Sequence, residues 1–390
     1  MALTQPAILG GLPAFPDGVQ FARPMRPPLD AVMARLAPSY EAGMLTNGPL
    51  VRELEERSAE RLGATHAVAV GNCTAGLMLA IRCLEVTGPV VLPGFTFSAS
   101  AHAVAWNGLE LRFAECDPKS FHLDLGHAAE LVVGAGAVLA THVFGAPCPV
   151  AGIEALARGA GAVTVFDAAH AFGATHREAP VGSFGDAEVF SLSPTKMVVA
   201  GEGGIVTTPH AEVAAAVRAG RDYGNPGDYD TRFVGLNARL SELHAALALE
   251  SLSRLDDHLG RRQILAARYT NGLADVPGVM PQAVVGGDRS TYKDYTVAVD
   301  EEVLGIDRDH LMTALKADGI DTRRYFDPPV HRQQAYAHLD PPALPVTEDV
   351  SARVLSLPMY GDLGPEVVDR IVEVIGNVHT HAEQVRASVA

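Results

Sequence analysis

The sequence predicts an α/β fold, in which a mostly parallel central sheet carries helices on both faces and a smaller α+β domain follows at the C-terminus. Between residues 45 and 245, short apolar segments alternate with helical patterns, which is typical of parallel strands covered on both sides. After Asn237 a long helical pattern begins, with Leu240 and Leu247 on one face. The chain has 390 residues, 48% of them hydrophobic, so it can bury more than one core.

Residues 31–245 are predicted to form the large domain. A helix is expected over Leu50–Leu62, because Gly48-Pro49 is a typical helix start and an apolar face follows it. Segment 131–143 is the most apolar part of this region, but its glycines and polar residues favour a helix end followed by a buried strand over a membrane span. The candidate strands are the short apolar segments 66–70, 90–92, 111–115, 137–143, 162–166, 189–192 and 204–208.

Residues 246–390 are predicted to form the small domain, which the long helix enters as it runs on to Tyr269. The segment TYKDYTVAVD at 291–300 predicts a strand, Asp307–Gly319 predicts a helix, and a closing helix is expected from Pro365 onward. Residues 1–30 are rich in Pro and Gly. They are expected to run as an arm across one domain or across a neighbouring subunit.

Composition excludes several classes of function. A net charge of −16 and a pI near 5.3 argue against a nucleic-acid partner, because no excess of Lys and Arg is present to neutralise phosphates. The N-terminal segment has no basic side chain before Arg23 and no long apolar stretch, so no secretory signal is expected. The four cysteines form no CxxC pair and are interpreted as small apolar residues. The sequence therefore predicts a reduced, cytoplasmic protein without a metal site or a membrane partner.

Polar residues gather where the predicted strands end, which is where open α/β sheets place their ligands. The turn Gly71–Gly76 (GNCTAG) joins a strand to a helix, and its free N–H groups, together with the Thr74 hydroxyl, could bind an anion. A plain tight connection explains this turn equally well. Asp167 directly follows another buried strand, with His170 three residues later. This aspartate is either a helix N-cap or the counter-ion of a protonated ring nitrogen.

Two further features complete the set. Lys196 lies between the strand that contains Ser191 and the glycine-rich GEGG segment. Such a lysine is either a solvated surface residue or, if it is confined in a pocket, a nucleophile with a lowered pKa. Asn237 lies in the segment GLNARL at the start of the long helical pattern, where an ordinary Asn cap is the simpler interpretation.

Together these motifs resemble those of the DegT/DnrJ/EryC1/StrS family of sugar aminotransferases, in the aspartate aminotransferase superfamily. The resemblance runs along nearly the whole chain, through VAVGNCTAGLMLA, LPGFTFSASA, THVFGAP, FDAAHAFGA, GSFGDAEVFSLSPTKMVVAGEGG, GLNARLSELHAALAL and GIDTRRYFDPPVHRQQAY. It implies the type I fold of enzymes that depend on pyridoxal 5′-phosphate. It also implies a homodimer in which both subunits contribute to each active site.

Carried over residue by residue, the resemblance makes Lys196 the lysine that holds the cofactor in a Schiff base and Asp167 the partner of its pyridine nitrogen. Phe97 would lie on the cofactor ring and His170 near its ring hydroxyl. Asn237 would reach the cofactor phosphate of the other subunit. The remaining assignments are Thr74, Ala75 and Ser191 to the phosphate, and Tyr325 and His331 to the nucleotide-sugar side of the pocket.

The resemblance further implies an amino-acid donor, L-glutamate by family precedent, and a nucleotide-linked keto-sugar as acceptor. His170 points to carbon 4 of a 4-keto-6-deoxyhexose, because relatives acting at carbon 3 often carry Gln at that position. Amination at carbon 3 and amination of a keto-cyclitol are the alternatives. Related dehydratases carry His at the position of Lys196, which argues against their chemistry, and a non-catalytic regulatory relative is the remaining possibility.

Overall fold

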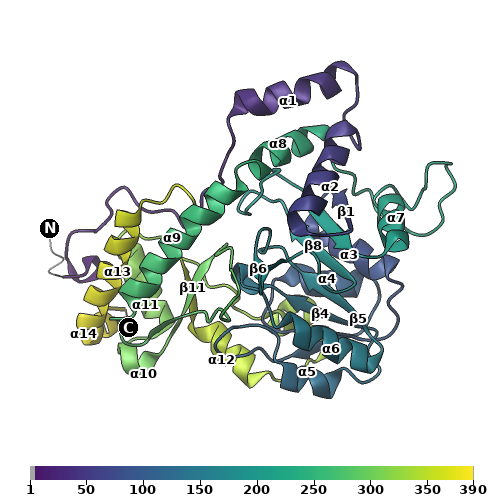
Figure 1. The fold of residues 1–390 in the computed structure, drawn as a ribbon. Coiled ribbons are helices and arrows are strands. Elements are labelled where there is room, and N and C mark those ends of the chain that lie inside the picture. The colour runs from purple at the N-terminus through teal and green to yellow at the C-terminus, as the bar shows by residue number, and fades with distance from the viewer. Residues whose placement is uncertain (1–4, 390) are drawn as a thin grey trace.

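The computed structural model describes residues 5–389, in which a seven-stranded sheet forms the centre of the larger half (Figure 1). The strand order is β1-β9-β8-β5-β4-β2-β3, and only β9 runs antiparallel to its neighbours. All seven predicted strands are therefore confirmed, and so is the mostly parallel sheet. Their bounds are β1 His66–Val70, β2 Val90–Pro93, β3 Leu111–Ala114, β4 Ala137–Thr141, β5 Val163–Asp167, β8 Ala187–Ser191 and β9 Gly204–Thr208.

Helices cover both faces of this sheet, as the sequence predicts. Along β1, Val68 and Val70 pack into one core with α3, α4 and α7, whereas Ala67 and Ala69 pack into another with α2 and α8. Helices α5 and α6 cover the second face over the remaining strands. The helices of this half are α1 Leu29–Glu41, α2 Pro49–Leu62, α3 Cys73–Cys83, α4 Ser98–Trp106, α5 Leu125–Leu131, α6 Val150–Ala160, α7 Ala211–Gly220 and α8 Glu242–Leu252.

The prediction of one long helix that runs on to Tyr269 is wrong, because this segment forms two helices. Helix α8 ends at Leu252 and α9 spans Leu255–Leu273, with the Ser253 hydroxyl donating to the Glu250 carbonyl at the break. The predicted start is also wrong, since Ser241 rather than Asn237 is the N-cap of α8 and accepts from the N–H of His244. The break lets α8 follow the sheet while α9 crosses into the C-terminal half (Figure 1).

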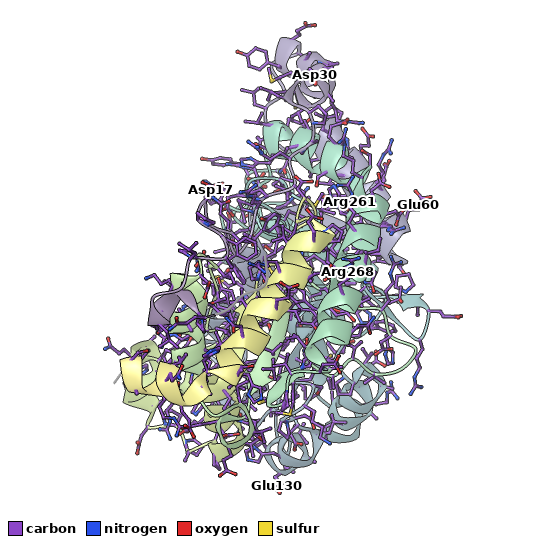
Figure 2. All side chains as sticks on the ribbon, turned by 90° about the vertical axis from the view of Figure 1, so that its left-hand side faces the viewer. Asp17, Asp30, Glu60, Glu130, Arg261 and Arg268 are labelled. Carbon is purple, nitrogen blue, oxygen red and sulfur yellow. The ribbon has the colours of Figure 1, made fainter. Side chains whose placement is uncertain are left out.

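The C-terminal half is built around a three-stranded antiparallel sheet, β10-β11-β12, and a separate hydrophobic core. Figure 2 shows α13 lying beside α9, where Arg268 is ion-paired with Asp369. The division of the chain at residue 245 remains a prediction. The remaining elements are β6 Thr175–His176, β7 Ala179–Pro180, β10 Val279–Pro281, β11 Tyr295–Val299, β12 Val354–Leu357, α9 Leu255–Leu273, α10 Glu301–Leu304, α11 Arg308–Ala317, α12 Pro345–Arg353, α13 Pro365–Thr380 and α14 Ala382–Val389.

The predicted arm runs over the C-terminal half of its own chain. The N–H of Phe15 donates to the carbonyl of Asp318, and Val19 forms a parallel bridge with Ile320. The first four residues of the predicted arm lie outside the described residues. None of the helices between residues 5 and 389 is both long and apolar enough to cross a lipid bilayer.

Helix α1 projects from the molecule and rests on α8, with Asp30 in its first turn (Figures 1 and 2). The fully buried carboxylate of Glu242 joins the two helices to α2. It accepts hydrogen bonds of 2.9–3.0 Å from the Ser39 hydroxyl and from the N–H groups of Gly48, Leu50 and Val51. One side chain thus satisfies the open N–H groups at the start of α2, where negative charge is also favoured by the helix dipole.

We expect Glu242→Ala to destabilise the fold by about 3 kcal/mol or more, because three buried N–H groups and a hydroxyl lose a charged acceptor. The matched control is Glu250→Ala on the same helix. Its carboxylate pairs with Arg35 in a partly exposed position, and its loss should cost about 1 kcal/mol or less. The midpoint of urea unfolding measures both effects, and equal shifts in the two variants would contradict this assignment.

Candidate active site

A cavity of about 540 Å³ opens at the carboxyl edge of the central sheet, where β5 and β8 end. Its floor is reached by the N-terminus of α3, which packs against β8. A Cβ on Gly76 would lie 2.7 Å from Cγ1 of Val189, so only glycine permits this approach. Seven of the ten predicted site residues line the cavity: Thr74, Phe97, Asp167, His170, Ser191, Lys196 and Tyr325.

Asp167 is the last residue of β5, and its carboxylate is buried in the cavity. One oxygen accepts from the Ser100 hydroxyl at 2.6 Å and the other from the Ala169 N–H at 3.1 Å. Burial raises the pKa of Asp167, while these two hydrogen bonds and the nearby Lys196 amine act against the rise. The N-cap interpretation of Asp167 is wrong, because residues 168–174 form turns rather than a helix.

A chain of buried hydroxyl groups supports this carboxylate from behind. The hydroxyl of Ser100 is 3.0 Å from that of Thr96, which in turn is 2.8 Å from that of Thr141. All three side chains are buried, and they belong to α4, the segment before it and β4. Each hydroxyl group is hydrogen-bonded to the next, and the last of them, on Ser100, donates to Asp167. The Asp167 carboxylate is therefore held in one orientation towards the cavity.

Lys196 lies in the irregular segment after β8, and its backbone N–H donates to the Ser193 carbonyl at 3.0 Å. Its amine lies in the cavity, where burial and the neighbouring ammonium of Lys293 lower the pKa to about 8, against the opposing charge of Asp294. A lysine of ordinary pKa would be almost wholly protonated at neutral pH. With a pKa of about 8, about a tenth of the Lys196 amine is neutral and nucleophilic at pH 7.

His170 lies beside Lys196 and is held in its neutral form. Burial and the positive charges of Lys196 and Lys293 lower its pKa well below the usual value. Its ring stacks on Phe144 at a centroid distance of 6.4 Å, and the buried Nδ1 has no hydrogen-bond partner within the chain. A buried nitrogen of this kind indicates that a ligand or water completes the site.

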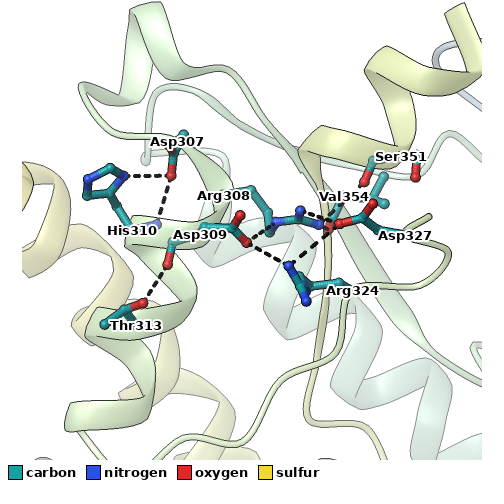
Figure 3. A network of polar contacts seen from close by, with 9 residues as sticks. All are labelled: Asp307, Arg308, Asp309, His310, Thr313, Arg324, Asp327, Ser351 and Val354. Carbon is teal, nitrogen blue, oxygen red and sulfur yellow. Dashed lines mark hydrogen bonds and ion pairs between the residues drawn. The ribbon is translucent and has the colours of Figure 1, made fainter. Parts of the chain in front are cut away.

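Aromatic side chains form the outer wall of the cavity. Phe97 is 56% exposed and lies 6.3 Å from Phe326, measured between ring centroids. The segment of Tyr325 and Phe326 is held by the adjacent Asp327, whose carboxylate accepts from buried Arg308 at 2.8 Å (Figure 3).

The same Arg308 guanidinium donates to the carbonyl groups of Ser351 and Val354, at 3.4 and 3.2 Å (Figure 3). It thereby ties the wall segment to α12 and β12 of the C-terminal half. The position of the aromatic wall therefore depends on how that half packs.

Three predicted site residues lie outside the cavity. The N–H of Ala75 donates to the Asn72 side chain at 2.8 Å as part of the α3 cap. Asn237 is exposed, and its side chain accepts from Arg239 at 3.1 Å. His331 is buried behind the wall, 3.1 Å from the Glu348 carboxylate. The roles proposed for these three residues stay predictions.

Three further charged residues line the cavity and are not among the predicted site residues: the exposed Glu202 and the buried neighbours Lys293 and Asp294. The two buried residues are the more informative. They lie just before β11, in the segment that was interpreted only as a strand of the small domain. The available signal was a Lys-Asp pair inside an otherwise apolar and aromatic run, where charges are costly to bury unless they are paired.

The doubly covered sheet, with Lys196 and the buried Asp167 lining one cavity at its carboxyl edge, matches the type I fold of pyridoxal-phosphate-dependent aminotransferases. Residues 30–376 match the model of the DegT/DnrJ/EryC1/StrS aminotransferase family, and the chain belongs to that family. The predicted family, fold and enzyme class are therefore confirmed. Enzymes of this family depend on pyridoxal phosphate.

Among solved structures, DesI in the presence of its TDP-sugar product matches with a TM-score of 0.93 and 38% identity, over 99% of both chains. The UDP-N-acetyl-3-dehydro-α-D-glucosamine 3-aminotransferase of Acidithiobacillus ferrooxidans is 34% identical over 83% of this chain and 87% of its own. The dTDP-4-amino-4,6-dideoxy-D-glucose transaminase of Escherichia coli is 29% identical over 92% of this chain and 98% of its own.

The lowered pKa of Lys196 generates a pH prediction. Covalent capture of pyridoxal phosphate by the cofactor-free protein needs the neutral amine, so its rate should rise about tenfold per pH unit below 8 and level off above it. Stopped-flow absorbance between pH 6 and 10 measures this rate, with Lys196→Ala as the variant that captures nothing. A rate still rising steeply near pH 10 would show that the amine has the pKa of an exposed lysine.

Proposed function

We propose that this protein uses pyridoxal phosphate to move an amino group from an amino acid, L-glutamate, to a nucleotide-linked keto-sugar. The proposed acceptor position is carbon 4 of a 4-keto-6-deoxyhexose. The observation that carries the proposal is the meeting of the Lys196 amine and the buried Asp167 carboxylate in one cavity, within an aminotransferase fold. The alternatives are carbon 3 of a nucleotide sugar and a keto-cyclitol.

The residues of the cavity fit the proposed cofactor. Asp167 is a buried carboxylate whose hydrogen-bond donors are both neutral groups. It is therefore free to pair with a protonated pyridine nitrogen, which requires a nearby negative charge. The unpartnered Nδ1 of His170 suits a ring oxygen. The start of α3, with Thr74, and the end of β8, with Ser191, offer hydroxyl groups and a helix N-terminus to a phosphate.

When bound, pyridoxal phosphate supplies an electron-accepting ring that stabilises negative charge on the carbon from which a proton is removed. Asp167 would keep the ring nitrogen protonated, because its carboxylate is fixed by Ser100 and faces no competing cation at hydrogen-bond distance. Lys196 would hold the cofactor and, once freed, take up and return that proton. An amine with a pKa of about 8 suits both directions of transfer near neutral pH.

Support for the acceptor comes from the relatives, whose names describe transaminases of nucleotide-linked amino sugars. These names include both carbon 3 and carbon 4, so they favour the substrate class without choosing the carbon. His170 favours carbon 4, because relatives that act at carbon 3 often carry Gln at that position. Its neutral ring offers a donor and an acceptor at different angles from those of a Gln amide.

We also propose a homodimer with shared active sites. Helix α1 exposes Leu29 (75%) and Tyr40 (68%), and the nearby Leu45 and Leu243 are more than half exposed. An apolar surface of this kind around a projecting helix suits burial by a second copy. Asn237 lies outside the cavity of its own chain, so a contact with a cofactor phosphate requires the cavity of the partner.

The choice of carbon can be tested with matched substrates. We expect the holoenzyme, with glutamate, to aminate a nucleotide-linked 4-keto-6-deoxyhexose, and NMR of the product to place the new amine on carbon 4. Lys196→Ala should lower turnover by several orders of magnitude. A clear preference for a 3-keto sugar would contradict carbon 4 alone. Absence of amination with every keto-sugar would contradict the proposed function.

The shared site can be tested by mixing inactive variants. If Asn237 acts on the partner's cofactor, a hybrid of Lys196→Ala and Asn237→Ala subunits has one intact site. An equal mixture after subunit exchange should therefore recover about one quarter of wild-type activity. Each variant alone is the control, and mass spectrometry under native conditions counts the hybrids. Inactive hybrids, once their formation is demonstrated, would contradict a shared site.

A further inference from the structure

The Lys293–Asp294 pair is a buried charged feature of the cavity that the proposed chemistry leaves unused. The two side chains are 5% and 2% exposed, and Nζ of Lys293 lies 2.6 Å from Oδ1 of Asp294. Both line the same cavity as Lys196 and Asp167. Burying two charges is costly even when they are paired, and apolar residues of similar volume are often tolerated in their place. A pair at this position therefore indicates binding rather than stability.

One atom of this pair lacks a partner within the chain. Oδ2 of Asp294 is buried without a hydrogen bond, and the residue lines the cavity. The ammonium of Lys293 has three N–H groups, of which one is used by Asp294. The cavity wall thus offers free donors and a free acceptor side by side, which a bound ligand would satisfy.

The chemistry of this wall discriminates between the two proposed substrates. A carboxylate of glutamate can only accept hydrogen bonds, and it would approach a lysine whose charge is already neutralised by Asp294. It would also leave Oδ2 of Asp294 unpartnered. A sugar hydroxyl accepts from Lys293 and donates to Asp294 at once, so it satisfies both groups.

We propose that Lys293 and Asp294 bind a ring hydroxyl of the hexose, next to the carbon that receives the amine. This inference rests on the proposed function and names the part of the substrate that the pair recognises. The pair lines the same cavity as Lys196, which is proposed to act at the reacting carbon, so a hydroxyl near that carbon is within the same space. Tyr325 lines this cavity from the outer wall.

The two charges of the pair have opposite effects on the pKa of Lys196. Lys293 lowers the pKa of Lys196 and Asp294 raises it, with Asp167 and Cys73 acting in the same direction as Asp294. Removing both members together therefore cancels part of the disturbance of the Lys196 amine that removing one of them would cause. The double variant Lys293→Met/Asp294→Leu is accordingly the appropriate test, and Arg268→Met/Asp369→Leu at an exposed ion pair is its matched control.

The two half-reactions are measured separately on the holoenzyme. Loss of the yellow cofactor absorbance on adding glutamate reports the donor half-reaction, and its return on adding nucleotide-linked 4-keto-6-deoxyhexose reports the acceptor half-reaction. We expect the double variant to retain the donor half-reaction within about twofold and to lose about 100-fold in the acceptor half-reaction. The control variant should change neither.

Two further measurements address the hydroxyl directly. In the first, keto-sugar analogues that each lack one ring hydroxyl are given to the wild type and to the double variant. The analogue that lacks the hydroxyl bound by the pair should react about equally with both proteins, because the contact is then absent from both. Calorimetry with the nucleotide-linked 4-amino sugar and the cofactor-free protein should show binding weakened about tenfold or more in the double variant.

Each other outcome overturns the inference. A loss confined to the glutamate half-reaction would make the pair a carboxylate site, and equal losses in both would make it a support for Lys196 or the fold. No loss in either would exclude contact with the substrate. A wild-type enzyme that consumes glutamate but aminates no nucleotide keto-sugar would instead overturn the proposed function, and this inference with it.

Discussion

A carboxylate buried at the end of a parallel strand is the constraint on which the rest of the site depends. Asp167 cannot be charged there without compensation, because desolvation favours its neutral form. The hydroxyl chain that begins at Ser100 and the N–H of Ala169 supply part of that compensation. The remainder has to come from the cavity side, where a cationic ring nitrogen would complete it.

The cavity itself is assembled from both halves of the chain. Its floor comes from the ends of β5 and β8, while its wall comes from the segments around Tyr325 and Lys293. Buried Arg308 holds the first of these wall segments through Asp327 and two backbone carbonyls. A change in packing of the C-terminal half is therefore transmitted to this wall, whereas Asp167 and Lys196 lie on the central sheet and its loops.

This division matches the two demands on an aminotransferase of this family. Dependence on pyridoxal phosphate is common to its members, and the residues proposed to carry that chemistry here, Asp167 and Lys196, lie on the sheet and its loops. The acceptor differs between relatives, as the names of carbon-3 and carbon-4 transaminases show. The pair proposed to bind a sugar hydroxyl, Lys293 and Asp294, lies on the C-terminal wall.

The sequence by itself determined the strands, the doubly covered sheet and the polar residues at its carboxyl edge. Buried parallel strands are recognisable in a sequence as short continuous apolar segments. The carboxyl ends of parallel strands lie at the same edge of the sheet, so the sequence alone predicts that Asp167 and Lys196 lie close together. The family resemblance added their chemical roles, which composition and spacing left open between functional and purely structural interpretations.

Only the tertiary structure decided the features that depend on contacts between distant segments. The break between α8 and α9 follows from packing on two different cores, which helical periodicity cannot show. In the sequence, Glu242 is an ordinary helix residue. Only the fold shows that the open N–H groups at the start of α2 donate to its carboxylate. Lys293 and Asp294 read as part of a strand, because only the fold reveals that they face Lys196 in a buried cavity. Burial of a charge depends on its whole environment, and neighbours in sequence supply little of that environment.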